Sequence, residues 1–355
     1  MNKLFFITYV GLLLLTSCSH ENLLIPKPNE NIRPAADFIE NNYDFRLFYA
    51  ALEYTDLVGE LNGPGPLTVL APGDAAFNAL GIRTPEDIAE LDKDSLRRVL
   101  QYHVLKDRRL RLADIPTDAV DVRYETLSGD ALFTSAGTRA SQYYFDGAAV
   151  THGDVALANG VLHVVNKLMK YHKGRTVQDY LAASPQYSLY VAGLKKFGLW
   201  DELAEAGPFT IFAPNNEAFA AHEITEEMIN DFASAGYNGR RLFGAYILYG
   251  KHFFVSDKYV FSIISNEYAY SLPLKDDTWS LTFGFQSIYP EWYVYPELSL
   301  WGPPAPPYGI PPRIGQVNYN ASESHIFNYD HRCENGIVHD LYELLILPEQ
   351  AIHEE

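Results

Sequence analysis

The side chains that could perform catalysis or bind a metal are eleven histidines, two cysteines and 45 aspartates and glutamates. Their spacing matches no catalytic motif: the chain has no nucleophile elbow, no phosphate-binding loop and no C-x-x-C pair. His222-Glu223 begins like a zinc-protease motif, but the second histidine is missing, and no three histidines share ligand-like spacing. We therefore expect a protein that is not an enzyme, with no catalytic residue, no cofactor and no metal site.

Three histidines lie in apolar surroundings. His163 and His339 each follow an Asn-Gly pair inside an apolar run, and His103 lies on the apolar face of a predicted helix. A histidine at such a position is more often a core residue, hydrogen-bonded to a neighbouring loop, than a ligand. A ligand-binding role is the alternative.

Aromatic residues are concentrated in the region 253–329, which holds three of the four tryptophans. Eight prolines between Pro290 and Pro312 predict an extended, irregular loop rather than a sheet interior, because proline fixes φ and lacks an N–H donor. Rings on a stiff loop could stack on sugars or on a protein partner; alternatively, they pack on their own domain as a lid. The candidate binding residues here are Trp279, Trp292, Tyr293, Tyr295, Trp301 and Tyr308.

Residues 1–17 resemble a lipoprotein signal peptide. Their apolar stretch, Leu4 to Leu15, is shorter than the roughly 20 residues that a membrane-spanning helix needs. Leu15-Thr16-Ser17-Cys18 resembles a bacterial lipobox, which would place a lipid on Cys18; an ordinary signal peptide is the alternative. The polar, proline-bearing segment 18–34 would then be a lipidated tether. Cys333 would remain as a lone thiol, expected to be inert and partly buried.

The formal net charge is −18, which argues against a nucleic-acid partner because phosphate binding needs clustered lysine and arginine. The length of 355 residues suffices for two domains, each with its own core.

A 13-residue stretch occurs twice in the chain. Gly65–Phe77 (GPLTVLAPGDAAF) and Gly207–Phe219 (GPFTIFAPNNEAF) share seven positions, and each predicts a buried strand that ends at a proline. A second pair of boxes, Asn159–Met169 and Asn335–Leu347, predicts a closing strand after an Asn-Gly turn. The same order of boxes in both halves indicates a duplicated domain.

Local signals place several elements between these boxes. Asp74 is expected to cap the short helix after the first repeated strand. Thr84, followed by Pro85, is expected to cap the next helix. Short alternating segments over 120–157 predict strands.

The two pairs of boxes, with Tyr102-His103 between the first pair, resemble the fasciclin (FAS1) domain family. The resemblance implies an α+β fold of two tandem FAS1-like domains, each a small β-sandwich or wedge covered by helices. We place domain 1 at 35–171 and domain 2 at 175–348, with an aromatic and proline-rich insertion at about 253–329. In some FAS1 proteins the Tyr-His region is associated with partner adhesion. Here that role can attach only to Tyr102 and His103, because Ala245-Tyr246 stands at this place in the second copy.

These features predict a non-catalytic lipoprotein of the bacterial cell envelope, of the Bacteroidetes type, that mediates adhesion or binding through its FAS1 domains. A lipid on Cys18 would hold it in the outer membrane, on the periplasmic or the surface-exposed face, with a protein or glycan ligand. The alternative function is a glycan-binding accessory protein of a polysaccharide-uptake system that uses the aromatic insertion.

Overall fold

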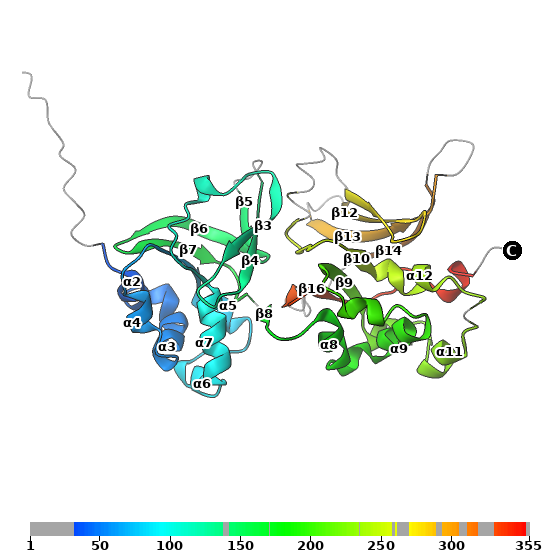
Figure 1. The fold of residues 1–355 in the computed structure, drawn as a ribbon, viewed down its shortest axis with the longest axis horizontal. Coiled ribbons are helices and arrows are strands. Elements are labelled where there is room, and N and C mark those ends of the chain that lie inside the picture. The colour runs from blue at the N-terminus through cyan, green and yellow to red at the C-terminus, as the bar shows by residue number, and fades with distance from the viewer. Residues whose placement is uncertain are drawn as a thin grey trace, which may run out of the picture. The chain divides into compact units, whose positions relative to one another are not determined.

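Figure 1 shows the fold as a computed structural model, which describes residues 32–137, 142–169, 171–233, 235–257, 260, 270–288, 293–304, 311–318 and 330–352. The predicted signal peptide and the tether up to residue 31, including Cys18, lie outside the described residues, as do Trp292 and Tyr308. In the part that is described, no helix combines the length and apolar character needed to cross a bilayer.

The helices of domain 1 lie on one side of its sheet (Figure 1). The apolar side chains Leu47, Phe48 and Leu52 of α3 are buried in the core. Thr84 caps α6 as predicted: it accepts a hydrogen bond from the Asp87 N–H, and the Asp87 carboxylate accepts one in return. The helices are α2 (Ala35–Glu40), α3 (Arg46–Tyr54), α4 (Val58–Leu61), α5 (Asp74–Asn78), α6 (Pro85–Ala89) and α7 (Lys93–Tyr102), with 3₁₀ turns η1 (Tyr43–Phe45) and η2 (Leu112–Asp114).

The repeated box and the closing box of domain 1 are adjacent strands, β1 (Leu67–Pro72) and β7 (Gly160–Val165), which pair in parallel. Side chains on both faces of β1 are buried: Val69 joins the core beneath the helices, and Leu70 joins a second core on the other face. The described strand order is β2-β1-β7-β6-β5-β4-β3. The remaining strands are β2 (Val104–Leu105), β3 (Ala119–Glu125), β4 (Ala131–Gly137), β5 (Gln142–Phe145) and β6 (Ala148–Leu157).

Domain 2 repeats this plan with the parallel pair β9 (Phe209–Pro214) and β16 (Gly336–Leu341). In the described residues their sheet has the order β10-β9-β16-β15-β8, with β10 (Ile247–Tyr249), β15 (His331–Cys333) and β8 (Tyr171–His172). The helices are α8 (Val177–Ala182), α9 (Ser188–Lys196), α10 (Asn216–Ala220), α11 (Glu226–Asp231) and α12 (Gly239–Leu242), with 3₁₀ turns η3 (Pro185–Tyr187), η4 (Asp201–Ala204), η5 (Gly244–Tyr246) and η7 (Pro348–Gln350). The chain thus has the predicted α+β fold of two tandem FAS1-like domains.

The prediction of an irregular loop across the proline-rich region is wrong for residues 293–301, which form a strand. The described parts of 253–329 contain a sheet of order β11-β12-β13-β14, formed by β11 (Tyr270–Pro273), β12 (Ser280–Ile288), β13 (Tyr293–Trp301) and β14 (Arg313–Asn318). This sheet lies between β10 and β15 in the chain, as β3–β5 lie between β2 and β6 in domain 1. Pro296 lies in β13, paired with Phe285 of β12 and just before Glu297, where the pairing with β14 begins.

The prediction that Asp74 caps its own helix is also wrong. Gly73 is the N-cap residue of α5, and no side-chain cap is made there. The Asp74 carboxylate instead accepts hydrogen bonds from Leu47 N (2.9 Å) and Arg46 Nε (3.1 Å) at the start of α3. Asn216 does the same in domain 2, where its side-chain oxygen accepts from Leu189 N at 3.1 Å. The side chain at this repeated position, Asp74 or Asn216, therefore links its own helix to the start of an earlier helix instead of capping its own helix.

Candidate binding sites

The two box histidines are structural in both domains. His163 Nδ1 accepts a hydrogen bond from Asp154 N (3.1 Å), and its Nε2 donates to the Leu110 carbonyl (2.8 Å). His339 makes the same pair of contacts with Asp330 N (3.0 Å) and the Phe253 carbonyl (2.8 Å). Burial lowers the pKa of both rings, so each stays neutral. This confirms the prediction of core histidines bonded to a neighbouring loop.

Tyr102 and His103 are buried at the end of α7, with 1% and 0% of their surfaces exposed. His103 Nδ1 donates to the Val99 carbonyl (2.8 Å), and its Nε2 accepts from Met169 N (3.0 Å). Burial lowers the pKa of His103 to about 4. Because this ring has no open face, it is a structural residue and does not itself offer a contact surface.

Tyr102 uses its hydroxyl inside the protein. The hydroxyl donates to the carboxylate of Asp146, whose other oxygen accepts from Phe133 N at 2.8 Å. Burial raises the pKa of both groups. The ring stacks on Tyr171, with 5.1 Å between centroids. Tyr102 thus links the helical layer to β4 and β5.

The described aromatic residues of the insertion do not form an open platform. Trp279 is 6% exposed and belongs to the domain 2 core, and the Arg241 guanidinium lies 4.3 Å from its ring centroid. Trp301 is half-buried, with Arg313 5.9 Å from its ring. Tyr293 and Tyr295 lie in β13, and their side chains are outside the described part of the structure. Burial gives Trp279 a packing role and leaves Trp301 as the described candidate.

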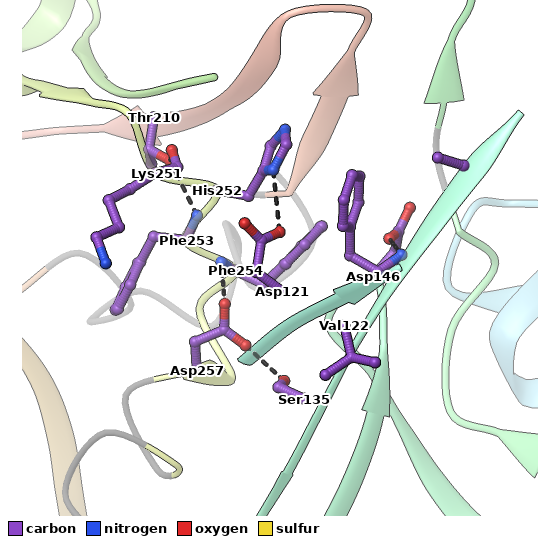
Figure 2. Close-up of polar contacts among 12 residues, drawn as sticks. Asp121, Val122, Ser135, Asp146, Thr210, Lys251, His252, Phe253, Phe254 and Asp257 are labelled. Atoms are coloured by element: carbon purple, nitrogen blue, oxygen red, sulfur yellow. Dashed lines mark hydrogen bonds and ion pairs between the residues drawn. The ribbon is translucent and has the colours of Figure 1, made fainter. Parts of the chain in front are cut away.

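The segment 251–257 of domain 2 lies against β3 and β4 of domain 1 (Figure 2). His252 Nδ1 is 3.0 Å from Asp121 Oδ1, and its ring centroid is 4.3 Å from that of Phe133. The Ser135 hydroxyl donates to Asp257 Oδ1 at 2.5 Å, and Phe254 N donates to Asp257 Oδ2 at 2.9 Å. These contacts define the domain junction.

Buried charge is concentrated at the domain junction. Asp257 is 1% exposed, and burial, with smaller contributions from Asp330 and Asp121, raises its pKa to about 7. Burial would also raise the pKa of Asp330, but the Lys167 ammonium of domain 1 and His339 lower it overall. Asp330 therefore forms a buried interdomain ion pair, whereas Asp257 takes up a proton near neutral pH.

Sequence reasoning did not find the domain junction. Its residues belong to no motif, and their pairing spans more than a hundred positions, as between Ser135 and Asp257. One signal was available in the repeat: Phe254 and Asp257 stand where domain 1 has Arg111 and Asp114. An apolar residue replacing an arginine three positions before a shared aspartate indicates a turn that is buried in one copy only.

A pocket of about 330 Å³ opens beside the buried Tyr102. Its wall combines the exposed side of α7 with the segment that leads into domain 2. The lining residues are Ser95, Arg98, Val99, Tyr102, Asp130, Met169, Tyr171, His172, Lys173 and Arg175. Tyr102 is itself a lining residue, so the pocket adjoins the predicted Tyr-His region.

Metal and thiol chemistry have no described site. Among the residues that the structure describes, no three histidine, cysteine or acidic side chains are grouped to hold an ion. Cys333 is buried, and burial raises its thiol pKa to about 12, so the reactive thiolate is scarce at neutral pH.

Comparison with known proteins identifies the family. The fasciclin domain profile matches residues 43–171 and 185–256. The chain is 33% identical over 129 residues to protein sll1483 of Synechocystis, which covers 36% of this chain and 68% of that protein. These matches include more than half of the chain, so it belongs to the fasciclin family.

Several larger relatives share part of the sequence. Mouse stabilin-2 is 26% identical over 182 residues, which are 50% of this chain but 7% of stabilin-2. Human periostin is 24% identical over 165 residues, which are 45% of this chain and 18% of periostin. The chain therefore spans a small part of these relatives. The solved FAS1 domain pair of the insect cell adhesion molecule fasciclin I aligns with 87% of this chain and 98% of that chain, at 19% identity and a TM-score of 0.37.

Proposed function

We propose that this chain is a non-catalytic adhesion protein of the bacterial cell envelope, attached through a lipid on Cys18 and binding a protein ligand through its fasciclin domains. The observation that carries the proposal is the presence of two fasciclin domains behind a lipobox-like segment. Adhesion is the role that the family resemblance implies, and the anchor would place the domains where a partner in the envelope can reach them.

The polar groups of the domains support a binding role rather than a catalytic one. The box histidines and Tyr102 are all engaged by backbone or buried partners. A general acid or base needs access to substrate, and these groups have none. Their arrangement holds strands and loops in place, as expected of a scaffold that presents a surface.

The anchor gives the proposal its location. Acylation at Cys18 would hold the protein in the outer membrane of a Bacteroidetes-type cell, on the periplasmic or the surface-exposed face. Residues 19–34 include three prolines and would act as the spacer between lipid and domain 1.

Metabolic labelling with an alkyne analogue of palmitate tests the anchor. The full chain should carry the label, Cys18→Ser should lose it, and Cys333→Ser should keep it. A label that persists in Cys18→Ser would contradict the lipid site.

Chemical crosslinking on intact cells tests the adhesion role. A specific protein partner should be recovered with the full chain and also with Trp301→Ala, because the proposed contact does not depend on the insertion. Failure to recover any protein above the level of cells lacking the chain would count against adhesion.

The glycan-binding alternative is supported by a single observation, which is the position of Trp301 on β13. Trp301 lies at the end of β13 and remains partly exposed. Affinity electrophoresis against a polysaccharide panel would show retardation that Trp292→Ala/Trp301→Ala abolishes. The control Trp200→Ala removes an indole in the helical part of domain 2 and should leave retardation unchanged.

A further inference from the structure

The pocket beside Tyr102 has a positive lining on an acidic protein. Arg98, Lys173 and Arg175 are all exposed, and Asp130 is the one carboxylate among the lining residues. The chain as a whole has a formal charge of −18. With Lys173 paired to Asp130, the two arginines still leave the lining with a net positive charge, which would attract an anionic group.

The polar groups in the pocket are only partly engaged with one another. Lys173 Nζ lies 3.0 Å from Asp130 Oδ1, and Asp130 Oδ2 also accepts from the Ser128 hydroxyl at 2.8 Å. Arg98 Nη2 donates to the Ser95 hydroxyl at 3.1 Å. A guanidinium has five N–H donors, so a single neutral contact leaves the Arg98 fork able to bind an acceptor.

A fourth cation lies behind the pocket wall. Arg332 is 4% exposed, and its guanidinium carbon lies 5.4 Å from the ring centroid of the lining residue Tyr171 and 5.0 Å from that of Phe133. Its Nε and Nη1 are buried without a hydrogen-bond partner among the described residues. Its charge is held in place by aromatic faces, so it adds positive potential to the same region.

We infer that this pocket binds the carboxylate side chains of an acidic peptide segment of a partner protein. This inference rests on the proposed function, since it names the chemistry of the protein ligand. Planar guanidinium groups match carboxylates in bidentate geometry, and two arginines line the pocket. The volume of about 330 Å³ is at the small end of ligand pockets, which suits a few side chains rather than a large cofactor.

The same features disfavour a phosphate group as the ligand. Phosphate sites commonly use several free backbone N–H donors, whereas the Ser95 N–H at this pocket is already bonded to Asp92 at 2.8 Å. The resident Asp130 would also repel a dianion more than the single charge of a carboxylate.

The test measures binding of poly-L-glutamate to the detergent-solubilised full chain by biolayer interferometry. Arg98→Gln/Arg175→Gln should weaken binding about tenfold or more, because two charge-assisted contacts are lost. The matched control Arg83→Gln/Arg109→Gln removes two exposed arginines and the same net charge elsewhere on domain 1, and it should weaken binding less than twofold. Equal weakening by both variants, or no binding by the unaltered chain, would overturn the inference.

A gain of affinity keeps the inference testable even if the double variant folds poorly. Asp130→Asn removes the competing carboxylate, frees Lys173 and keeps the acceptor for Ser128, so poly-L-glutamate binding should become several-fold tighter. Unchanged or weaker binding would contradict the pocket assignment. Polygalacturonate is the comparison polymer: if it binds through this pocket more tightly than poly-L-glutamate, the ligand is an acidic glycan and the peptide assignment fails. Neither result affects the labelling test of the Cys18 anchor.

Discussion

The segments 108–114 and 251–257 occupy the same place in the two domains but have different surroundings. In both, an aspartate accepts from the backbone N–H three residues earlier: Asp114 from Arg111 N at 3.2 Å, and Asp257 from Phe254 N at 2.9 Å. Asp114 is exposed, whereas Asp257 is buried against domain 1. The same turn is therefore part of the surface in domain 1, where Arg111 is exposed, and part of the domain junction in domain 2, where Phe254 is buried.

The two copies also differ at the end of one helix, where domain 1 has His103 and domain 2 has Tyr246. Met169 N donates to His103 Nε2 in domain 1, and the equivalent Leu345 N donates to the Tyr246 hydroxyl at 2.9 Å in domain 2. The fold thus requires an acceptor for this buried amide, and either an imidazole or a phenol provides it.

The largest expected effect is a pH-dependent change in unfolding free energy when Asp257 is replaced, with its counterpart Asp114 as the control. Asp257 has a folded pKa of about 7, above its usual value, so its contribution to stability is full below pH 4 and is lost as pH rises through 7. Asp257→Asn should therefore be more stable than the unaltered chain at pH 8, by up to about 4 kcal/mol, with the difference shrinking towards pH 4. Urea unfolding at both pH values measures this. Asp114→Asn, at the exposed counterpart, is the control, and a difference independent of pH would disprove the assignment.

The next effect concerns the asparagines that begin the closing strands. Asn335 accepts from Val177 N and donates to the carbonyls of Leu203 and Glu205, and Asn159 makes the equivalent three bonds. Either alanine variant should lose about 3 kcal/mol of unfolding free energy, with the larger loss at the more buried Asn335. Asn78→Ala, at an exposed position, should change stability by less than about 0.5 kcal/mol. A loss in only one domain would show that the repeat is not equivalent here.

Low pH should destabilise the helix end at His103 in domain 1 but not the one at Tyr246 in domain 2. The pKa of His103 is about 4 in the folded protein, below its usual value, so its stabilisation is full above pH 6.5 and falls as pH drops towards 4. Between pH 7 and pH 4 the unaltered chain should lose about 3 kcal/mol of unfolding free energy because of His103, and His103→Gln should not show this loss. Tyr246→His should add a similar acid sensitivity to domain 2. Domain-resolved hydrogen exchange measures both, and identical acid profiles for all three proteins would contradict the comparison.

Removing the phenol acceptor should cost somewhat less. Tyr246→Phe leaves Leu345 N buried without its partner, which should lower the unfolding free energy by about 2 kcal/mol. Tyr43→Phe, where the ring is 79% exposed, is the matched control and should be near neutral in the same urea titration. A neutral Tyr246→Phe would mean that the amide finds another acceptor.

The smallest effect compares two equivalent helix caps. Thr84 and Asp87 form a reciprocal capping box, whereas Thr225 accepts from Met228 N at 3.3 Å without a return bond. Thr84→Ala should cost about 1 kcal/mol, and Thr225→Ala less. Equal losses on urea unfolding would show that the return bond contributes nothing.

Elements fixed by local signals were predictable from the sequence. The closing strands, the Thr84 cap and the bonded core histidines follow from patterns a few residues long. The sheet in the insertion was missed because its prolines outweighed the alternation of Leu281 and Phe283 in β12. Asp74 is predicted to be a cap because it begins a helical pattern, but the sequence does not show that the start of α3 lies beside it.

The candidate sites were less predictable than the fold. The family resemblance implied a contact role for Tyr102 and His103, whereas the apolar helix face predicted a buried His103, and both side chains are buried. Asp257 and Ser135 lie far apart in sequence, so no local pattern joins them. The cationic pocket draws its lining from α7 and the interdomain segment, which only folding brings together.

Strand β8, which joins the domains, has a mechanical consequence. It pairs with β15 through two residue pairs, whereas the central parallel ladder of each domain has six. Under the proposed function, a chain held by its N-terminal anchor and pulled through domain 2 would carry tension across this joint. That tension would open the short ladder at the joint first, so the connection would lengthen under load while both cores stayed folded.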